Sequence, residues 1–403
     1  MRKSLPTGAL AFNPRALDDV RAMPKPNLVL VVLDDLIAAD LSPARAPNWN
    51  DLIAQGTEHT NAYSMPVCSQ SRACILFGRL GRSLGILQAM NAEEGPEPPA
   101  DALTLPSLLR SAGYSTALVG KWHLGRHPVS LTPIGAPLGR GYDRWIAGSL
   151  DNLDSYTAWQ RYEDGQPPQI EMGYATQVQM TAARAWWDAT PHPKFLHIAL
   201  AAPHAPFHNP PPALLGGYTP DPSLPVNRQR YERMIRSADW ALGELRQFPG
   251  IQNSLVCVVA DNGTPQNATA PGQDPERVKT TTYEDGIRVA CAWRGPGITA
   301  DADSHALTHL VDIPARFLQA AGVSVPSCWD YEEPRQNAIS EAILAGGVHE
   351  RAVISFDGYK LRRTGDQPEE LYYLPEDPFE LNDLVSSPGY QETLASLRAL
   401  LYA

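Results

Sequence analysis

A short segment in the first quarter of the chain places a cysteine and an arginine at a spacing suited to nucleophilic chemistry. Cys68 opens the stretch Cys-Ser-Gln-Ser-Arg and Arg72 closes it. From Ser71 onward the residues are typical of the first turns of a helix. A helix start presents unpaired N–H groups and the positive end of the helix dipole, so it favours an anion and should make a cysteine there ionise more easily. The alternative is a buried structural cysteine beneath a helix start.

Two pairs of oxygen-bearing side chains follow apolar, β-branched runs. Asp34 and Asp35 follow residues 27–33, and Asp261 and Asn262 follow a second such run. These runs are typical of parallel strands buried on both faces, and open α/β sheets bind ligands at the carboxyl ends of their strands. Together the pairs could supply oxygen ligands for Ca²⁺ or Mg²⁺. Taken alone, the first pair could cap a helix and the second could form a common turn.

Basic side chains follow other predicted strands. Lys121 and His123 come after a strand predicted at 114–119, His204 comes after a later strand, and Lys279 lies in a polar loop. A single lysine or histidine in a loop is more often a surface residue than part of a site. None of them identifies a site on its own.

The elements that would position these residues alternate as in an α/β fold. Buried strands and amphipathic helices follow one another up to about residue 325, with strands at 27–33, 114–119, 195–201 and 255–259 and helices at 104–112, 176–189, 230–245 and 305–322. Beyond this point we predict three short strands and a terminal helix. We therefore predict a large domain over 1–325 with a mostly parallel sheet flanked by helices, and a small α+β subdomain over 326–403 with an antiparallel sheet and one helix.

Residues 126–172 are rich in Gly, Pro, Trp and Tyr and show little periodicity. Long irregular stretches inside enzymes often shape a substrate pocket, so Ser149 is a candidate to line it. The alternative is that this stretch only packs against the rest of the chain.

Composition excludes several classes of protein. The 403 residues carry a net charge of −11 and no long basic block, which argues against a nucleic-acid partner. No apolar run reaches membrane-spanning length, and the N-terminus lacks the apolar core of a signal peptide. The five cysteines are odd in number and widely spaced, which fits a reducing compartment. We expect a cytoplasmic protein that does not act at a membrane.

In order along the chain, these segments resemble the type I (formylglycine-dependent) sulfatases of the alkaline phosphatase-like superfamily. The family's first signature is Cys-x-Pro-Ser-Arg followed by an apolar helix and Thr-Gly-Arg, and it is matched by Cys68, Ser71, Arg72, Gly78 and Arg79. Gln70 stands where the family has Pro, and Phe77 stands where Thr is usual. The second signature, Gly-Lys-Trp-His-Leu-Gly, is matched throughout at 120–125. The resemblance runs from about residue 25 to 383.

The resemblance implies a sulfuric ester hydrolase of the arylsulfatase type. A formylglycine-generating or equivalent maturase would convert Cys68 to formylglycine (3-oxoalanine), whose hydrated aldehyde is the family's nucleophile. The implied cofactor is Ca²⁺, with Mg²⁺ or Mn²⁺ as alternatives. Its ligands would be residue 68 together with Asp34, Asp35, Asp261 and Asn262.

The resemblance also assigns roles to the basic residues. Arg72 would fix the nucleophile, and Lys121 and Lys279 would grip the sulfate oxygens. His204 would protonate the leaving group with help from Lys279, and His123 would act as the base of the second step. The substrate-binding residues would be Lys121, His204, Lys279 and Ser149.

Three functions stay open at this point. The first is hydrolysis of a small aryl or alkyl sulfate monoester, which the compact chain favours over a polymeric glycan. The second is hydrolysis of a phosphonate monoester or phosphodiester, which the same superfamily catalyses at the same kind of site. The third is anion binding without turnover at an unmodified Cys68, because the maturation machinery reads the position of Gln70. The oligomeric state is open too, a homo-oligomer included.

Overall fold

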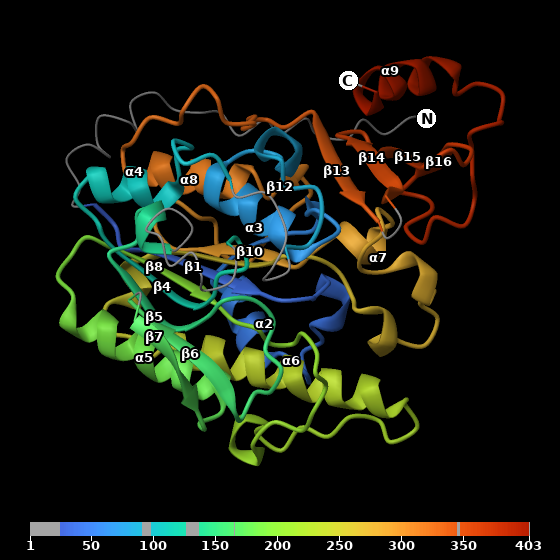
Figure 1. The fold of residues 1–403 in the computed structure, drawn as a ribbon. Coiled ribbons are helices and arrows are strands. Elements are labelled where there is room, and N and C mark those ends of the chain that lie inside the picture. Colours follow the sequence, from blue (N-terminus) through green and yellow to red (C-terminus); the bar gives the residue numbers. More distant parts are fainter. Residues whose placement is uncertain (1–24, 91–97, 126–136, 165, 345–346, 403) are drawn as a thin grey trace.

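The computed structural model describes residues 25–90, 98–125, 137–164, 166–344 and 347–402 (Figure 1). The first 24 residues of the predicted large domain lie outside these ranges. The described chain contains a ten-stranded sheet with the order β11-β2-β10-β9-β1-β8-β4-β5-β6-β7 and a separate four-stranded sheet near the C-terminus. Within these ranges no helix combines the length and apolar character needed to cross a bilayer.

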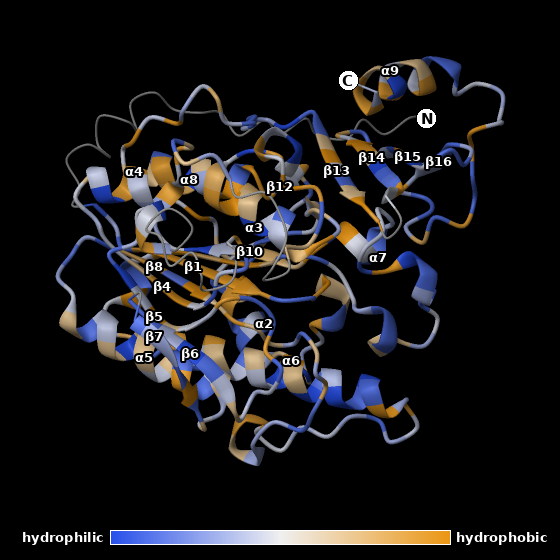
Figure 2. Cartoon of the chain, viewed as in Figure 1, coloured by the Kyte–Doolittle hydropathy of each residue, from blue (hydrophilic) through white to orange (hydrophobic). Residues whose placement is uncertain are grey.

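The centre of the large sheet is parallel. Strand β1 (Leu28–Leu33) lies between β8 (Lys194–Ala199) and β9 (Leu255–Ala260), and β4 (Ser115–Lys121) and β5 (Arg144–Ser149) continue the parallel order beyond β8. Every residue of β1 and β9 is buried, and these strands appear as an apolar band in Figure 2. The runs of Val, Leu and Ile therefore form buried parallel strands, as predicted.

Antiparallel or short strands extend the sheet on both sides. On the β9 side lie β10 (Cys291–Arg294), β2 (Gly56–His59) and β11 (Ala302–Ser304); on the β5 side lie β6 (Trp159–Glu163) and β7 (Gln166–Glu171). Four of the neighbouring pairs are antiparallel, namely β9–β10, β10–β2, β5–β6 and β6–β7. The sheet is thus parallel where the polar residues at its strand ends meet.

Helices cover both faces of this sheet, and another short pair of strands lies beside it (Figure 1). One face carries α2 (Pro47–Ala54), α5 (Ala175–Ala189) and α6 (Val226–Leu245), and the other carries α3 (Cys68–Phe77), α4 (Leu105–Ser111) and α8 (Asp312–Ala320). The short pair joins β3 (Ala62–Tyr63) to β12 (Thr308–His309). Because β12 occupies residues predicted to begin the last helix, α8 starts at Asp312 rather than at 305.

Residues 126–172 do not form the irregular stretch predicted from their composition, as far as they are described. They contain β5, β6 and β7, which complete one side of the large sheet. Strand β7 is the last strand on this side and carries Pro167 and Pro168 in sequence. Its pairing with β6 shifts register between Arg161 and Glu163. The prediction of an irregular stretch was wrong; strand β7 in particular was not foreseen because an exposed edge strand has no apolar periodicity.

The C-terminal residues form the small antiparallel sheet and the single helix that were predicted, with one strand more. The order is β13 (Asn337–Ile343), β14 (His349–Ser355), β15 (Tyr359–Thr364) and β16 (Glu370–Tyr373), followed by α9 (Gln391–Leu401). One face packs on α9 through Val353, Leu361, Leu371, Leu394 and Leu397. The other face packs against Tyr63 and the short helix α7 (Glu284–Ile287) of the preceding chain.

Short 3₁₀ helices complete the connections between these elements. They lie at Ala38–Asp40, Gly81–Leu84, Pro137–Arg140, Pro212–Leu214, Ile251–Asn253, Gln266–Ala268 and Pro275–Arg277.

Candidate active site

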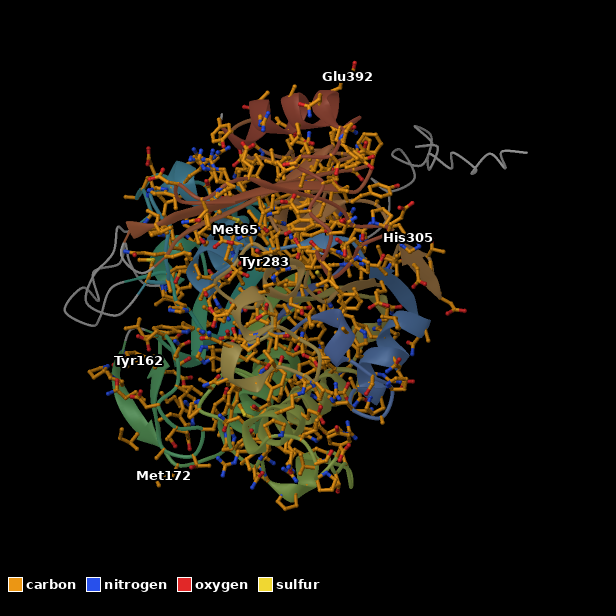
Figure 3. All side chains as sticks on the ribbon, turned by 90° about the vertical axis from the view of Figure 1, so that its right-hand side faces the viewer. Met65, Tyr162, Met172, Tyr283, His305 and Glu392 are labelled. Carbon is orange, nitrogen blue, oxygen red and sulfur yellow. The ribbon has the colours of Figure 1, made fainter. Side chains whose placement is uncertain are left out.

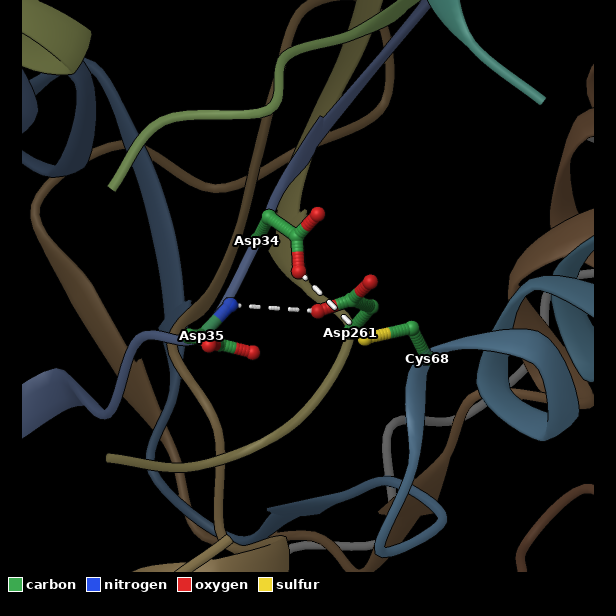
Figure 4. A group of neighbouring side chains, drawn as sticks. All are labelled: Asp34, Asp35, Cys68 and Asp261. Atoms are coloured by element: carbon green, nitrogen blue, oxygen red, sulfur yellow. Dashed lines mark hydrogen bonds between the residues drawn. The ribbon is translucent and has the colours of Figure 1, made fainter. Parts of the chain in front are cut away.

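Four side chains from three distant parts of the chain meet at the carboxyl ends of β1 and β9. Asp34 and Asp35 follow β1, Asp261 follows β9, and Cys68 is the first residue of α3. Their ligand atoms all lie within 4.8 Å of one another, and all four residues are buried (Figure 4). Because β1 and β9 are parallel neighbours, residues that end them must lie side by side. The structure thus brings together the predicted metal ligands.

The amide of Asn262 completes this cluster. Its Oδ1 lies 3.1 Å from the Cys68 Sγ, and its Nδ2 donates to Asp35 Oδ1 at 2.6 Å. The amide oxygen therefore faces the cysteine, where it could serve as a neutral oxygen ligand. Gly263 follows directly, and a Cβ there would lie 1.9 Å from the carbonyl oxygen of Asp285. Only glycine allows the chain to turn here without moving that carbonyl.

The backbone of Asp35 adopts a left-handed conformation, with φ 68°. This conformation is uncommon outside glycine and is kept only where the surroundings hold it. The Asp35 N–H donates to Asp261 Oδ1 at 3.2 Å, and the hydroxyl of Tyr231 donates to the Asp35 carbonyl at 2.7 Å. Tyr231 lies on α6, and no local pattern around Asp35 indicated this contact. It is a positioning residue that sequence reasoning missed.

Two cations pair with these carboxylates. Arg72 NH2 lies 2.8 Å from Asp261 Oδ2 and 3.3 Å from Asp34 Oδ2. Lys121, at the end of β4, donates its Nζ to Asp34 and also to Asn152 Oδ1 at 2.6 Å. All of these charges are buried, so each depends on its partner.

A third cation approaches from the loop after β9. Lys279 Nζ lies 2.5 Å from Asp35 Oδ1 and 3.4 Å from the Cys68 Sγ. His204 Nε2 lies 3.7 Å from Asp35 Oδ2, and its Nδ1 lies 2.7 Å from the Ala205 carbonyl, to which only a protonated nitrogen can donate. Lys279 and His204 therefore share one carboxylate next to residue 68. Among the described residues, the site thus holds three carboxylates and three cations, together with two histidines.

His123 and Ser149 are buried near the end of β4, where Ser149 is the register partner of Lys121 on the neighbouring strand β5. His123 lies 2.9 Å from the Met90 carbonyl through Nε2, so this nitrogen carries the proton and Nδ1 keeps its lone pair. Within the described residues, His123 Nδ1 and Ser149 Oγ are both buried without a hydrogen-bond partner. His123 Nδ1 is therefore free to accept a proton, as the base predicted from the resemblance must do.

The carboxylates differ in their affinity for protons. Burial opposes ionisation of Asp34, but Lys121 and the other nearby cations hold the pKa of this carboxyl well below its usual range. Burial, followed by the charge of Asp34, raises the pKa of Asp261 to about 6. Two carboxylates this close repel each other, and a cation shared between them removes that repulsion.

The thiol of Cys68 is not activated in this environment. Burial raises its pKa, and the charges of Asp261 and Asp34 raise it further, despite the nearby Lys279. The prediction that the helix start makes this cysteine ionise easily is therefore wrong for the unmodified residue. The helix dipole is a local effect, whereas the two carboxylates come from residues far away in the sequence.

Both histidines stay neutral at physiological pH. Burial lowers the pKa of His204, although Asp35 and Asp34 act in the opposite direction. Burial also lowers the pKa of His123 well below its usual range, and Lys121 adds to the effect. Neutral imidazoles can accept a proton in the site and give it up again.

Gln70 is enclosed in the first turn of α3. It is fully buried, and within the described residues neither atom of its amide has a hydrogen-bond partner. Its Cγ lies close to Gly81, where a Cβ would approach it to 3.3 Å. Although Gln70 replaces the proline of the signature, Cys68 and Arg72, which are four residues apart on α3, both contact the carboxylates.

Comparison with known proteins agrees with this geometry. The family model described as Sulfatase matches residues 26–323, which is most of the chain. The chain belongs to the sulfatase family. The resemblance found in the signatures is thereby confirmed.

The similar proteins of known name include sulfatases from mammals. The N-acetylgalactosamine-6-sulfatase of Homo sapiens is 33% identical over 346 residues, covering 75% of this chain and 63% of the relative. Arylsulfatase J of Mus musculus is 29% identical over 290 residues, covering 66% and 47%. This sulfatase therefore spans less than two thirds of the length of either relative.

Solved structures share its fold. The crystal structure of Ps i-CgsB superimposes with a TM-score of 0.82 at 24% identity, covering 93% of this chain and 92% of that one. The PsFucS1 sulfatase from Pseudoalteromonas sp. gives 0.74 at 20% identity, covering 96% and 91%. The predicted α/β fold with a large central sheet and a small C-terminal sheet is confirmed.

Proposed function

We propose that this sulfatase hydrolyses a sulfate monoester of a small aryl or alkyl alcohol at residue 68, with a divalent cation bound beside it. The observation that carries the proposal is the meeting of Asp34, Asp35 and Asp261 around Cys68, with Arg72, Lys121 and Lys279 against them. Hydrolases of anionic esters need such preorganised charge where negative charge builds up.

The donor set fits a hard divalent cation. Three carboxylates and the oxygen of Asn262 are the ligand types that Ca²⁺, Mg²⁺ and Mn²⁺ prefer. Burial, and after it the charge of Asp34, raises the pKa of Asp261, and a shared cation would oppose both effects. The carboxylates and the three basic side chains balance in charge, so a bound divalent cation leaves the site positive. A positive buried site favours a singly charged sulfate monoester.

When present, the cation supplies Lewis acidity, and formylglycine at residue 68 supplies a hydroxyl nucleophile in place of the thiol. The side chains of the protein supply the rest of the chemistry. Lys121 and Lys279 meet the sulfate oxygens, and one such preorganised contact contributes about 3–4 kcal/mol to lowering the barrier. His204, on the Lys279 side, donates its Nδ1–H to the Ala205 carbonyl, so it would first take up a proton at Nε2 and then give that proton to the leaving oxygen. His123 would take up a proton at Nδ1, the atom that its contact with Met90 leaves free.

Activity assays on a panel of esters can reduce the number of candidate substrates. The relatives' names point to a 6-sulfated N-acetylgalactosamine and to aryl sulfates as the first compounds to compare. We expect Ca²⁺-dependent turnover of at least one of them, and loss of turnover by a factor of a hundred or more in Lys121→Ala, as for removal of one preorganised donor. Faster hydrolysis of an aryl phosphonate would instead favour the phosphonate esterase.

A second candidate function rests on Gln70. If the maturase does not accept this residue, Cys68 keeps its thiol, whose pKa burial raises. The site would then bind sulfate or a sulfate ester without turnover. The mass of the peptide that contains residue 68, in protein from the native host, separates the two. An aldehyde mass supports hydrolysis, whereas a thiol mass with measurable sulfate binding supports the second function.

A further inference from the structure

The loop that carries Lys279 is bound to the C-terminal residues by two buried carboxylates, Glu350 on β14 of the small sheet and Glu380 between β16 and α9. The N–H and the hydroxyl of Thr282 both donate to Glu350 Oε1, at 2.6 and 2.8 Å. The N–H of Glu284 donates to Glu380 Oε2 at 2.7 Å. Hydrogen bonds from backbone N–H groups to ionised carboxylates are among the stronger ones in proteins. Two backbone positions just beyond Lys279 are therefore fixed by residues more than sixty positions later in the chain.

Two cations on β15 hold these carboxylates in place. Lys360 Nζ lies 2.9 Å from Glu284 Oε1 and 2.8 Å from Glu380 Oε1, and Arg362 NH2 lies 2.8 Å from Glu350 Oε1. Lys360 and Arg362 alternate along the strand with Leu361, which packs on α9. They therefore lie on the face of the small sheet that is turned toward the active-site loop.

An aromatic contact adds to the same interface. The guanidinium of Arg362 lies 3.7 Å from the centre of the Tyr283 ring, and the Tyr283 hydroxyl donates to Glu370 Oε2 at 2.8 Å. Figure 3 places Tyr283 beneath the C-terminal strands, with α9 and Glu392 on the far side of those strands. Each residue from 282 to 284 thus contacts the small sheet.

The charges in this interface are costly to bury. Lys360, Glu350, Glu380 and Arg362 are all at most 3% exposed. Apolar residues of similar size would give an interface of equal or greater stability, because they need no desolvation of charge. Unlike apolar side chains, these carboxylates form directional hydrogen bonds, and each one fixes the position of a particular backbone N–H. The interface is therefore suited to setting a position rather than to adding stability.

The other end of the loop is bound to the active site itself. The N–H of Lys279 donates to the Thr264 carbonyl at 2.9 Å, and the N–H of Thr280 donates to the Pro66 carbonyl at 3.0 Å. Thr280 has φ 77°, which is rare for a β-branched residue and costs roughly 1–3 kcal/mol. Such a conformation persists only where contacts before and after it in the chain hold it. The hydrogen bonds of Lys279 and Thr280 to the active-site segments hold one end of this turn, and those of Thr282 and Glu284 to the two carboxylates hold the other end.

We propose that the C-terminal region positions Lys279 through a carboxylate clamp, in which Glu350 of β14 and Glu380 of the segment after β16 hold residues 282 and 284 and thereby keep the strained turn at Thr280. Glu350 and Glu380 are positioning residues in this arrangement, because they act only through the loop. The inference rests on the proposed function insofar as Lys279 is assigned to substrate.

Amide hydrogen exchange tests the clamp without reference to activity. In Glu350→Ala, we expect the Lys279 and Thr280 amides, which do not contact Glu350, to exchange at least tenfold faster, while the amides of β1 keep their rates. Glu350→Gln keeps an acceptor for Thr282, so we expect a smaller increase, and this variant carries the test if the alanine variant does not fold. Unchanged exchange at both amides in a folded variant would overturn the proposal.

Glu341→Ala is the matched control. Glu341 is a buried carboxylate of the same sheet, on β13, and pairs with Arg351 at 2.8 Å, but none of its ion pairs or hydrogen bonds in the described chain reaches residues 279–284. We expect unchanged exchange at Lys279 and Thr280 in this variant. Equal acceleration in Glu341→Ala and Glu350→Ala would show a general loosening of the sheet, which contradicts a clamp.

A double-mutant cycle connects the clamp to catalysis. We expect Glu350→Ala to lower kcat on the best sulfate ester about tenfold in the wild-type background and to have no further effect in Lys279→Ala. The same loss in both backgrounds would show that Glu350 does not act through Lys279. If no ester is turned over while the exchange results hold, the proposed function fails and the clamp stands. If turnover is found and exchange is unchanged, the reverse is true.

Discussion

Replacing Arg72 with glutamine tests whether the carboxylate cluster binds a cation. Arg72 lies between Asp261 and Asp34, and all three are buried. Removing one partner of a buried ion pair costs about 3–5 kcal/mol. Because Lys121 still pairs with Asp34, we expect the lower end, about 3 kcal/mol, in the free energy of unfolding of the metal-free protein. Urea denaturation in the presence of a chelator measures this loss.

Binding of Ca²⁺ should restore much of the stability that the Arg72→Gln substitution removes. The guanidinium lies within 3.3 Å of oxygens that would hold the cation, so the two positive charges repel each other. At an effective dielectric constant of about 20, unit charges a few ångströms apart interact by several kcal/mol. We therefore expect Arg72→Gln to bind Ca²⁺ at least tenfold more tightly than the wild type, which is about 1.4 kcal/mol more stabilisation at saturation. Calorimetric titration gives the affinity directly.

Arg228→Gln provides the comparison. Arg228 is likewise buried between two carboxylates, Asp40 and Glu232, but it pairs with neither Asp34 nor Asp261. It should lose a similar amount of stability and show wild-type calcium affinity. If Ca²⁺ stabilises the wild type and both variants equally, or stabilises none of them, the cluster around Cys68 is not a cation site and the reasoning is refuted.

Three further perturbations have definite expected results. Tyr231→Phe removes the donor to the Asp35 carbonyl, so metal affinity should fall about fivefold, by roughly 1 kcal/mol, in a calorimetric titration; unchanged affinity would count against the positioning role. Gly263→Ala places a Cβ 1.9 Å from the Asp285 carbonyl, and we expect a lower melting temperature and weaker Ca²⁺ binding; a wild-type melting curve would show that this turn can relax. Burial, assisted by a nearby arginine, lowers the pKa of His197 to about 3, so the unfolded chain takes up a proton below pH 6.5 that the folded chain takes up only near pH 3. The free energy of unfolding should therefore fall by roughly 3 kcal/mol from pH 7 to pH 4 on account of this group. In His197→Gln, urea denaturation should show that the free energy of unfolding falls less steeply over this pH range, by the equivalent of about one proton. An identical slope in the variant would exclude His197 as the cause.

The sequence was most informative about the strands at the centre. Continuous runs of Val and Leu predicted β1 and β9, and the rule that ligands gather at strand ends placed Asp34 near Asp261 before any coordinates were known. The family signatures supplied the link to Cys68. The roles assigned to the individual side chains stay predictions, although the structure brings those side chains together.

Non-local contacts account for what could not be foreseen. The helix start predicted an easily ionised thiol at Cys68, yet burial, together with carboxylates from two other segments, raises its pKa instead. Tyr231 contacts Asp35 from α6, and Glu350 contacts Thr282 from the small sheet. No sequence pattern near these residues predicts either contact. Strand β13 was missed because its run Asn-Ala-Ile-Ser-Glu-Ala-Ile has few residues of high β propensity. The boundary predicted at 325 stays a prediction.

Strand β7 has a consequence for how copies of this sulfatase can meet. Consecutive residues in a strand direct their N–H groups to opposite sides, so Pro167 and Pro168 together remove one donor toward β6 and one toward solvent. The first loss coincides with the register shift against β6. The second leaves the outer rim of the sheet with a gap in its row of donors, which discourages a foreign strand from adding there. Self-association by sheet extension is thus disfavoured at the β7 edge.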